Sequence, residues 1–169
     1  MHRKKLACLL LLAAVAPAVA IADNTLVKFK GGIGVIPVSS APGPAPTAAT
    51  VNRNIVRGVQ PPGQIWTIED LRAEVRTDGR ISVDGRGLLL AGGNGIGTNA
   101  NQRVFATLIC EAAAPFVERS TDATGVALEP DGDFRIDDVL VPAPTDCASP
   151  VLLIRNTGGA WFAAGIPKQ

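Results

Sequence analysis

Short segments in which apolar and polar residues alternate recur along this chain, and glycine-containing turns separate them. In LRAEVRTDGRISVDG, residues 71–85, a three-residue loop at 77–79 places the apolar residues of both halves on one face. The pairs are Val75 with Ile81 and Ala73 with Val83 on that face, and Arg72 with Asp84 and Glu74 with Ser82 on the other. A register slipped by one residue buries the charges, so we expect a β-hairpin in this register.

Two later segments predict hairpins of the same kind. TGVALEPDGDFRIDDVL, residues 124–140, repeats the turn design around Pro130. It pairs Leu128 with Phe134 and Val126 with Ile136. SPVLLIRNTGGAWFAAGIP, residues 149–167, turns near 156–159 and pairs Leu153 with Trp161 and Leu152 with Phe162.

Both faces are apolar in this third hairpin and in residues 88–91 and 104–109. A strand of a simple sandwich has one face in water. Either other segments of the chain cover these strands, or the domain presents an apolar surface to a partner or to another copy of itself. Apolar strand residues usually belong to a core, which favours the first interpretation.

The pattern as a whole predicts an all-β protein. Thirteen prolines and eighteen glycines are scattered through the 169 residues, which argues against long helices. We expect an antiparallel β-sandwich or partly open barrel of about eight strands. It divides into an N-terminal strand segment (23–38), an extended and poorly structured Pro/Ala-rich connection (39–50), and a main β-domain (51–169).

Residues 1–22 have the layout of a secretory signal peptide. Arg3, Lys4 and Lys5 precede an apolar run, and small residues follow at alternate positions, so cleavage is expected after Ala20 or Ala22. The apolar run is shorter than the roughly 20 residues that span a bilayer. We expect export to the periplasm or the medium, with no transmembrane segment in the mature chain.

Removal of this leader changes the chemistry available to the protein. The mature chain keeps 13 Lys and Arg against 15 Asp and Glu, a formal charge of −2, which does not fit a nucleic-acid-binding surface. The only histidine, His2, is lost, so Ser-His and Cys-His catalysis are excluded. We expect no enzyme activity and no cofactor, although a carboxylate pair of the glycosidase type stays open because only the fold sets its spacing.

Two cysteines remain, Cys110 and Cys147. An even pair in an exported chain, without a Cys-x-x-Cys motif, predicts a structural disulfide.

The glycine-rich loop AGGNGIGTNAN, residues 91–101, is a candidate site for a ligand. It is not a dinucleotide loop, because Thr98 stands where the third glycine belongs and a strand pattern follows instead of a helix. It mainly turns the chain, but Asn94, Asn99 and Asn101 could contact a ligand. Trp66, which follows a Pro-Pro-Gly corner, is either a core residue or an exposed anchor for a ligand.

Glu129, Asp131 and Asp133 converge at the mouth of the second predicted hairpin. They are weak candidates for a cation site, because their spacing is not that of a calcium-binding loop, and a solvated turn is favoured. These observations together favour an exported, non-enzymatic binding or interaction module of unspecified ligand. The alternatives are a self-associating structural component of an envelope or extracellular matrix and a carboxylate-dependent hydrolase.

Overall fold

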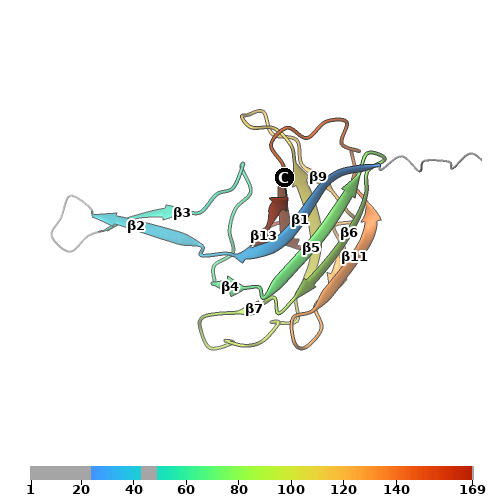
Figure 1. Ribbon diagram of the computed structural model, residues 1–169. Coiled ribbons are helices and arrows are strands. Elements are labelled where there is room, and N and C mark those ends of the chain that lie inside the picture. The colour runs from blue at the N-terminus through green and yellow to red at the C-terminus, as the bar shows by residue number, and fades with distance from the viewer. Residues whose placement is uncertain (1–23, 43–48, 169) are drawn as a thin grey trace, which may run out of the picture.

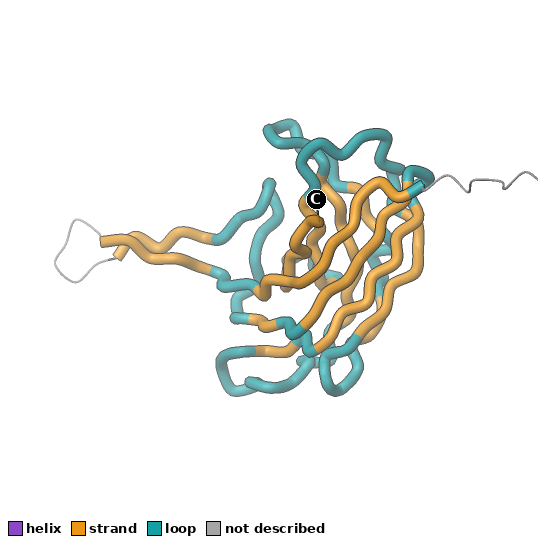
Figure 2. Tube along the Cα trace, in the orientation of Figure 1, coloured by secondary structure: helices purple, strands orange, loops and turns teal. Residues whose placement is uncertain are grey.

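The computed structural model describes residues 24–42 and 49–168, which form β-strands joined by turns and loops (Figures 1 and 2). The leader, residues 1–22, and the middle of the Pro/Ala-rich connection, residues 43–48, lie outside the described residues. The strands are β1 (Thr25–Gly34), β2 (Val38–Pro42), β3 (Ala49–Arg53), β4 (Trp66–Thr67), β5 (Asp70–Arg76), β6 (Arg80–Arg86), β7 (Leu89–Leu90), β8 (Arg103–Ile109), β9 (Arg119–Ser120), β10 (Val126–Ala127), β11 (Phe134–Val139), β12 (Val151–Asn156) and β13 (Trp161–Lys168).

The main sheet curls into a nearly closed antiparallel barrel of eight strands. Their order is β10-β8-β12-β13-β1-β5-β6-β11, with β9 also paired to β8. The seam between β10 and β11 is the one place where the barrel is not sealed by a strand ladder. The all-β class and the partly open barrel predicted from the sequence are therefore confirmed.

The N-terminal strand β1 is an integral part of this barrel, between β13 and β5. Within the predicted connection, β2 and β3 pair with one another and form a two-stranded arm that projects from the barrel (Figure 1). No helix in the described part of the chain is long and apolar enough to cross a membrane.

The first predicted hairpin is confirmed residue by residue. Strands β5 and β6 pair Val75 with Ile81, Ala73 with Val83, Glu74 with Ser82 and Arg72 with Asp84. Gly79 has a φ of 86°, the left-handed conformation that the three-residue loop requires, and its N–H donates to the Arg76 carbonyl. Local turn chemistry is sufficient to set this register.

The second predicted hairpin is wrong beyond its turn. The turn forms, with the Glu129 N–H donating to the Asp133 carbonyl, but β10 then pairs with β8 and β11 pairs with β6. Asn99 Nδ2, in the loop between β7 and β8, donates to the carbonyls of both Leu128 and Glu129 at the start of the turn. The two arms of the expected hairpin therefore belong to different ladders, and the seam between them is open.

The third predicted hairpin forms with a different register. Strands β12 and β13 pair Leu152 with Gly165 and Leu153 with Ala164, not with the aromatic residues. The loop is again three residues long with a left-handed glycine, Gly159 at φ 87°, and the Asn156 N–H donates to the Ala160 carbonyl. A register shift between Ile154 and Arg155 displaces the remaining pairs.

Inward-pointing side chains fill the barrel. Along β5 and β6 the buried positions alternate with exposed ones, which is the expected pattern for strands with one face in water. The strands β8 and β12 differ, because six of the seven residues of β8 and the three central residues of β12 are buried without alternation. The segment between β3 and β4 contributes Val56 and Val59 to the apolar core, and the loop between β8 and β9 contributes Phe116.

Specific contacts hold these two segments in place. The Trp161 indole Nε1 donates to the Asn54 carbonyl, and Arg57 Nη1 donates to the Ile109 carbonyl at the end of β8. Arg57 also lies over the ring of Phe116, which is in the β8–β9 loop. Burial within the chain accounts for most of the two-sided apolar residues, as the first of the two sequence interpretations expects, while Ile33 in β1 and Ile166 in β13 are exposed.

Candidate functional site

The base of the β2–β3 arm is fixed to the barrel through Asn54. Its backbone N–H donates to the Pro37 carbonyl at 2.9 Å, and its side-chain Nδ2 donates to the Ile36 carbonyl at 3.0 Å. These two bonds hold the residues before β2 beside those after β3. The arm therefore leaves the barrel at a defined position.

A corner of the chain faces this base. The Pro-Pro-Gly sequence at 61–63 turns the chain toward β4, where the Trp66 N–H donates to the Val35 carbonyl at 3.1 Å. Arg53 Nη2, at the end of β3, reaches the Pro61 carbonyl at 3.4 Å. The corner, the arm and the start of the glycine-rich loop therefore meet in one place.

Between them lies an open groove of about 470 Å³. Its lining comes from Pro37, Val38, Arg53, Pro62, Gly63, Gln64, Ile65, Gly92 and Gly93. The Ala91 N–H donates to the Ile65 carbonyl at 2.9 Å, which joins the glycine-rich loop to the corner. We call this feature the arm-base groove.

The arm-base groove is mostly apolar and largely exposed to solvent. Val38 is 46% exposed and Ile65 is 41% exposed, and Ile36 and Ile55 at the foot of the arm are exposed as well. Arg53 is the one charged side chain of the lining. Such a surface can bind an apolar segment by burial, while a single guanidinium offers no acid–base pair for catalysis.

The ligand contacts expected from the sequence lie in different places. Trp66 is 4% exposed and its ring stacks on Phe162 with centroids 4.1 Å apart, so it is a core residue and not an exposed anchor. Asn99 uses its amide to hold the Leu128 and Glu129 carbonyls and its Oδ1 to accept the Asn101 N–H. Both Asn99 and Trp66 thus have structural roles.

Asn94 and Asn101 are exposed, and neither lines the arm-base groove. Asn101 has a positive φ of 51°, which suits its place in an irregular turn. The part of the glycine-rich loop that does reach the groove is Gly92 and Gly93. Gly93 has a φ of 75°, a left-handed conformation that favours glycine at this point of the loop.

The acidic residues of the second turn are engaged in local hydrogen bonds. Asp131 Oδ1 accepts the Asp133 N–H, and Asp133 Oδ1 accepts the Gly87 N–H at 3.0 Å. Glu129 is exposed. Within residues 24–42 and 49–168, no group of three His, Cys, Asp or Glu side chains is arranged so that it could hold a metal ion. Glu129, Asp131 and Asp133 therefore do not form such a group.

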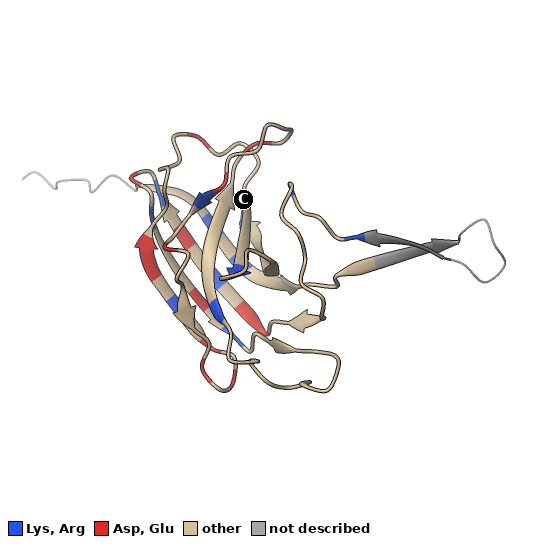
Figure 3. Cartoon of the chain, turned by 180° about the vertical axis from the view of Figure 1, so that it is seen from behind, with Lys and Arg blue, Asp and Glu red and all other residues tan. Residues whose placement is uncertain are grey.

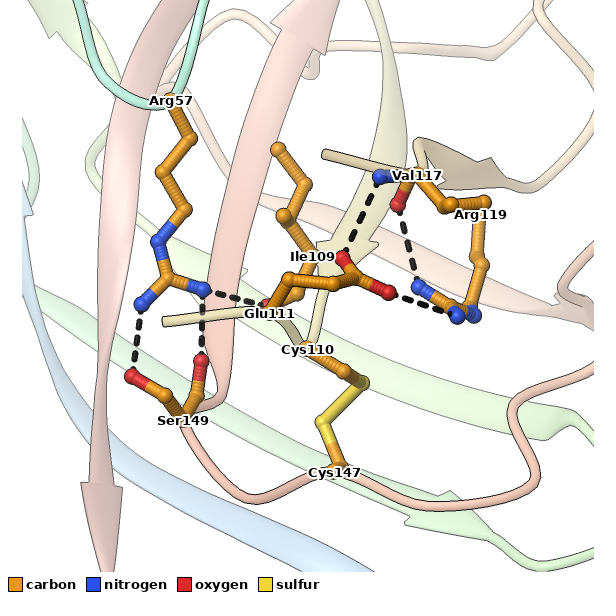
Figure 4. The surroundings of a disulfide bond; sticks show 8 residues. All are labelled: Arg57, Ile109, Cys110, Glu111, Val117, Arg119, Cys147 and Ser149. Carbon is orange, nitrogen blue, oxygen red and sulfur yellow. Dashed lines mark hydrogen bonds and ion pairs between the residues drawn. A yellow bond between two sulfur atoms is a disulfide. The ribbon is translucent and has the colours of Figure 1, made fainter. Parts of the chain in front are cut away.

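The predicted disulfide between Cys110 and Cys147 is confirmed, and an ionic cluster surrounds it (Figure 4). Arg119 Nη2 lies 2.8 Å from Glu111 Oε1, and this hydrogen bond lowers the pKa of the Glu111 carboxyl to about 2. The Val117 N–H also donates to this carboxylate. The cluster fixes the β8–β9 loop against the disulfide.

No family model, curated protein or solved structure matches this chain.

Sequence analysis missed the groove because its residues come from four separate stretches of chain. The sequence points to two of these stretches, the Pro-Pro-Gly corner and the glycine-rich loop, but the residues that it favours there are Trp66 and the asparagines, not Ile65, Gly92 and Gly93. One usable signal was present: Ile36, Val38, Ile55 and Ile65 are apolar residues beside prolines or polar residues, outside any alternating strand pattern.

Proposed function

We propose that this protein is an exported, non-enzymatic interaction module that binds an extended segment of another protein at the arm-base groove. The bound segment adds a strand to the β2–β3 arm and places its apolar side chains against Val38 and Ile65. The observation that carries this proposal is the position of an exposed apolar groove at the foot of a projecting two-stranded arm.

The arm supports strand addition through its backbone. Among the described residues, β2 and β3 pair only with each other, so each strand has an outer edge of free backbone donors and acceptors. A two-stranded ribbon is at best marginally stable in water, and a third strand stabilises it. Such edges bind extended segments by main-chain hydrogen bonds, while side-chain pockets give specificity.

The groove supplies those pockets at the end of the arm. Exposed apolar surface gathered in one place is typical of interaction sites. The expected ligand is therefore an extended peptide with apolar residues at alternate positions, because alternate residues of a strand point to the same face.

Export is the second part of the proposal. It is supported by the signal-peptide layout of residues 1–22 and is compatible with the Cys110–Cys147 disulfide, which forms in oxidising compartments. The absence of histidine from the mature sequence supports a non-enzymatic role, because the commonest general base is missing.

Site-specific photo-crosslinking in the producing organism tests the binding site. A photoreactive amino acid replaces Ile65 in the full chain, and a matched chain carries it at Val141, an exposed apolar residue that does not line the groove. The proposal expects one discrete adduct from position 65, mapped by mass spectrometry to a single segment of another protein, and none from position 141.

A substitution separates binding from folding. Ile65→Asp should abolish the adduct at a second photoreactive position, Val38, and leave the melting temperature unchanged, because Ile65 is exposed. Equal adducts at positions 65 and 141, adducts only with another copy of this chain, or no adduct at all would overturn the proposal.

A further inference from the structure

The outer side of the barrel is strongly charged over one half of its circumference. Strands β1, β5, β6 and β11 present charged side chains at their exposed positions, and Figure 3 shows basic and acidic residues banded across these strands. An open hollow of about 1020 Å³ lies on this face and is lined mostly by charged side chains. The two borders of the charged face differ in sign.

Five cations gather at the border formed by β13, β1 and the adjacent strand β5. We call this set the basic edge: Lys28, Lys30, Arg72, Arg76 and Lys168. Strand register places Lys28 directly opposite Lys168 and Lys30 directly opposite Arg72. Like charges in directly opposite positions of a sheet repel and are destabilising.

Carboxylates neutralise the basic edge only in part. Glu74 lies 3.7 Å from Lys28 and 4.0 Å from Arg76, and Asp70 pairs with Arg72. In the described part of the chain, Lys30 and Lys168 have no ion pair. Five cations against two carboxylates leave a formal local charge of +3.

The opposite border is acidic. We call this set the acidic edge, and it follows β11 and the turns that flank the seam: Asp122, Glu129, Asp131, Asp133, Asp137 and Asp138. Arg135, which pairs with Asp137, is the one cation among residues 122–138. Arg103, which donates to the Thr124 and Gly125 carbonyls within this stretch, lies at the same edge, so six carboxylates and two guanidiniums give it a formal charge of −4.

The two edges are separated on the barrel. Strand order places β5 and β6 between β1 and β11, so the lysines of the basic edge lie on one side of the hollow, and Asp137 and Asp138 of the acidic edge line its other side. A second copy supplies the missing countercharge, because each copy presents one edge of each sign.

We propose that copies of this protein associate head to tail, with the basic edge of one copy against the acidic edge of the next. Charge complementarity carries this assignment, since opposite potentials steer association and fix the orientation of partners. Because the two contacting surfaces are different, the contact is heterologous and each added copy exposes a new edge of each sign. This contact is independent of the arm-base groove.

Charge-reversal variants of the mature chain test the proposal by multi-angle light scattering. The basic-edge variant carries Lys28→Glu, Lys30→Glu and Lys168→Glu, and the acidic-edge variant carries Glu129→Lys, Asp131→Lys and Asp137→Lys. The wild-type mass should rise with concentration at low salt and return to that of the monomer at about 0.5 M salt, where charges are screened within a few Å. Asp146→Lys, on an exposed residue outside both edges, is the control and should behave like wild type.

The decisive sample is a mixture of the two variants. Each variant alone should remain monomeric, because it lacks one of the two edges. An equimolar mixture should form a 1:1 dimer and no larger species, because one intact edge of each sign remains. A wild-type chain that is monomeric at all concentrations at low salt, self-association that persists in either variant alone, or a mixture that stays monomeric would overturn the proposal.

Discussion

Arg57 joins the segment between β3 and β4 to the chain near the disulfide through Ser149. Its Nη1 donates to the Ser149 carbonyl at 2.6 Å, and its Nη2 donates to Ser149 Oγ at 2.7 Å (Figure 4). The same guanidinium donates to the Ile109 carbonyl. One side chain therefore connects the segment after β3 to the end of β8 and to the residue two positions after Cys147.

Replacing Arg57 should destabilise the protein. Arg57→Ala removes three charge-assisted hydrogen bonds and leaves two carbonyls without this donor, so we expect a loss of about 2–4 kcal/mol in the free energy of unfolding. Urea denaturation measures it. Arg76→Ala, on an exposed arginine, serves as the control and should cost under about 0.5 kcal/mol. Equal losses for the two variants would contradict the connecting role of Arg57.

Removing the disulfide should have a comparable effect. Cys110 and Cys147 are 37 positions apart, and closure of a loop of this size stabilises the folded state by about 4 kcal/mol in the chain-entropy description. The double variant Cys110→Ser/Cys147→Ser should show this loss in urea. Intact-mass analysis of the mature wild-type chain, which lacks Cys8, after alkylation without reductant should detect no modified thiol, and two modified thiols would refute the bond.

Acid should destabilise the protein through the Glu111–Arg119 pair beside the disulfide. The hydrogen bond from Arg119 lowers the pKa of Glu111 in the folded state from 4.5 to about 2. Because the pKa is lower in the folded state, the ionised Glu111 stabilises the folded state fully above about pH 5, and this contribution is lost as the pH falls toward 2. Melting temperatures across this range should fall less steeply for Glu111→Gln than for wild type. If the melting temperatures of the two proteins fell in parallel with pH, the Glu111–Arg119 pair would not contribute to the pH dependence of stability.

Gly85 and Phe134 should be energetically coupled. They are opposite each other in β6 and β11, and a Cβ at position 85 would lie 2.2 Å from the Phe134 ring. Gly85→Ala should therefore cost about 1–3 kcal/mol through overpacking. In Phe134→Leu the ring is gone, so the added methyl group should cost less, and a double-mutant cycle measures the difference. Additive effects would contradict direct contact.

How far the sequence predicts this structure depends on the range of the interactions. The β5–β6 register follows from alternation and from the left-handed Gly79, because both lie within fifteen residues. The disulfide is predicted because Cys110 and Cys147 are the two cysteines that follow the leader and they do not form a Cys-x-x-Cys motif. The β10–β11 pairing failed because β10 pairs with β8 and β11 pairs with β6, and no local pattern reveals these distant partners.

The candidate site was less predictable than the fold for the same reason. Trp66 was open to two interpretations, and only its stacking on Phe162 places it in the core. The arm-base groove requires β2 and β3 to pair across a Pro/Ala-rich stretch that reads as an unstructured connection. Val38 and Ile65 then become neighbours of the same groove although 27 positions separate them in sequence.

Amide hydrogen exchange is the measurement that tests strand addition to the arm most directly. The probe is a synthetic peptide of the partner segment that cross-links to position 65, added in excess to the mature chain. The account predicts that this peptide slows exchange of amides in β2 or β3, because they become donors in a new strand ladder, and that Ile65→Asp prevents the effect. Unchanged exchange in both strands, or protection confined to β5, β6 and β11, would contradict it.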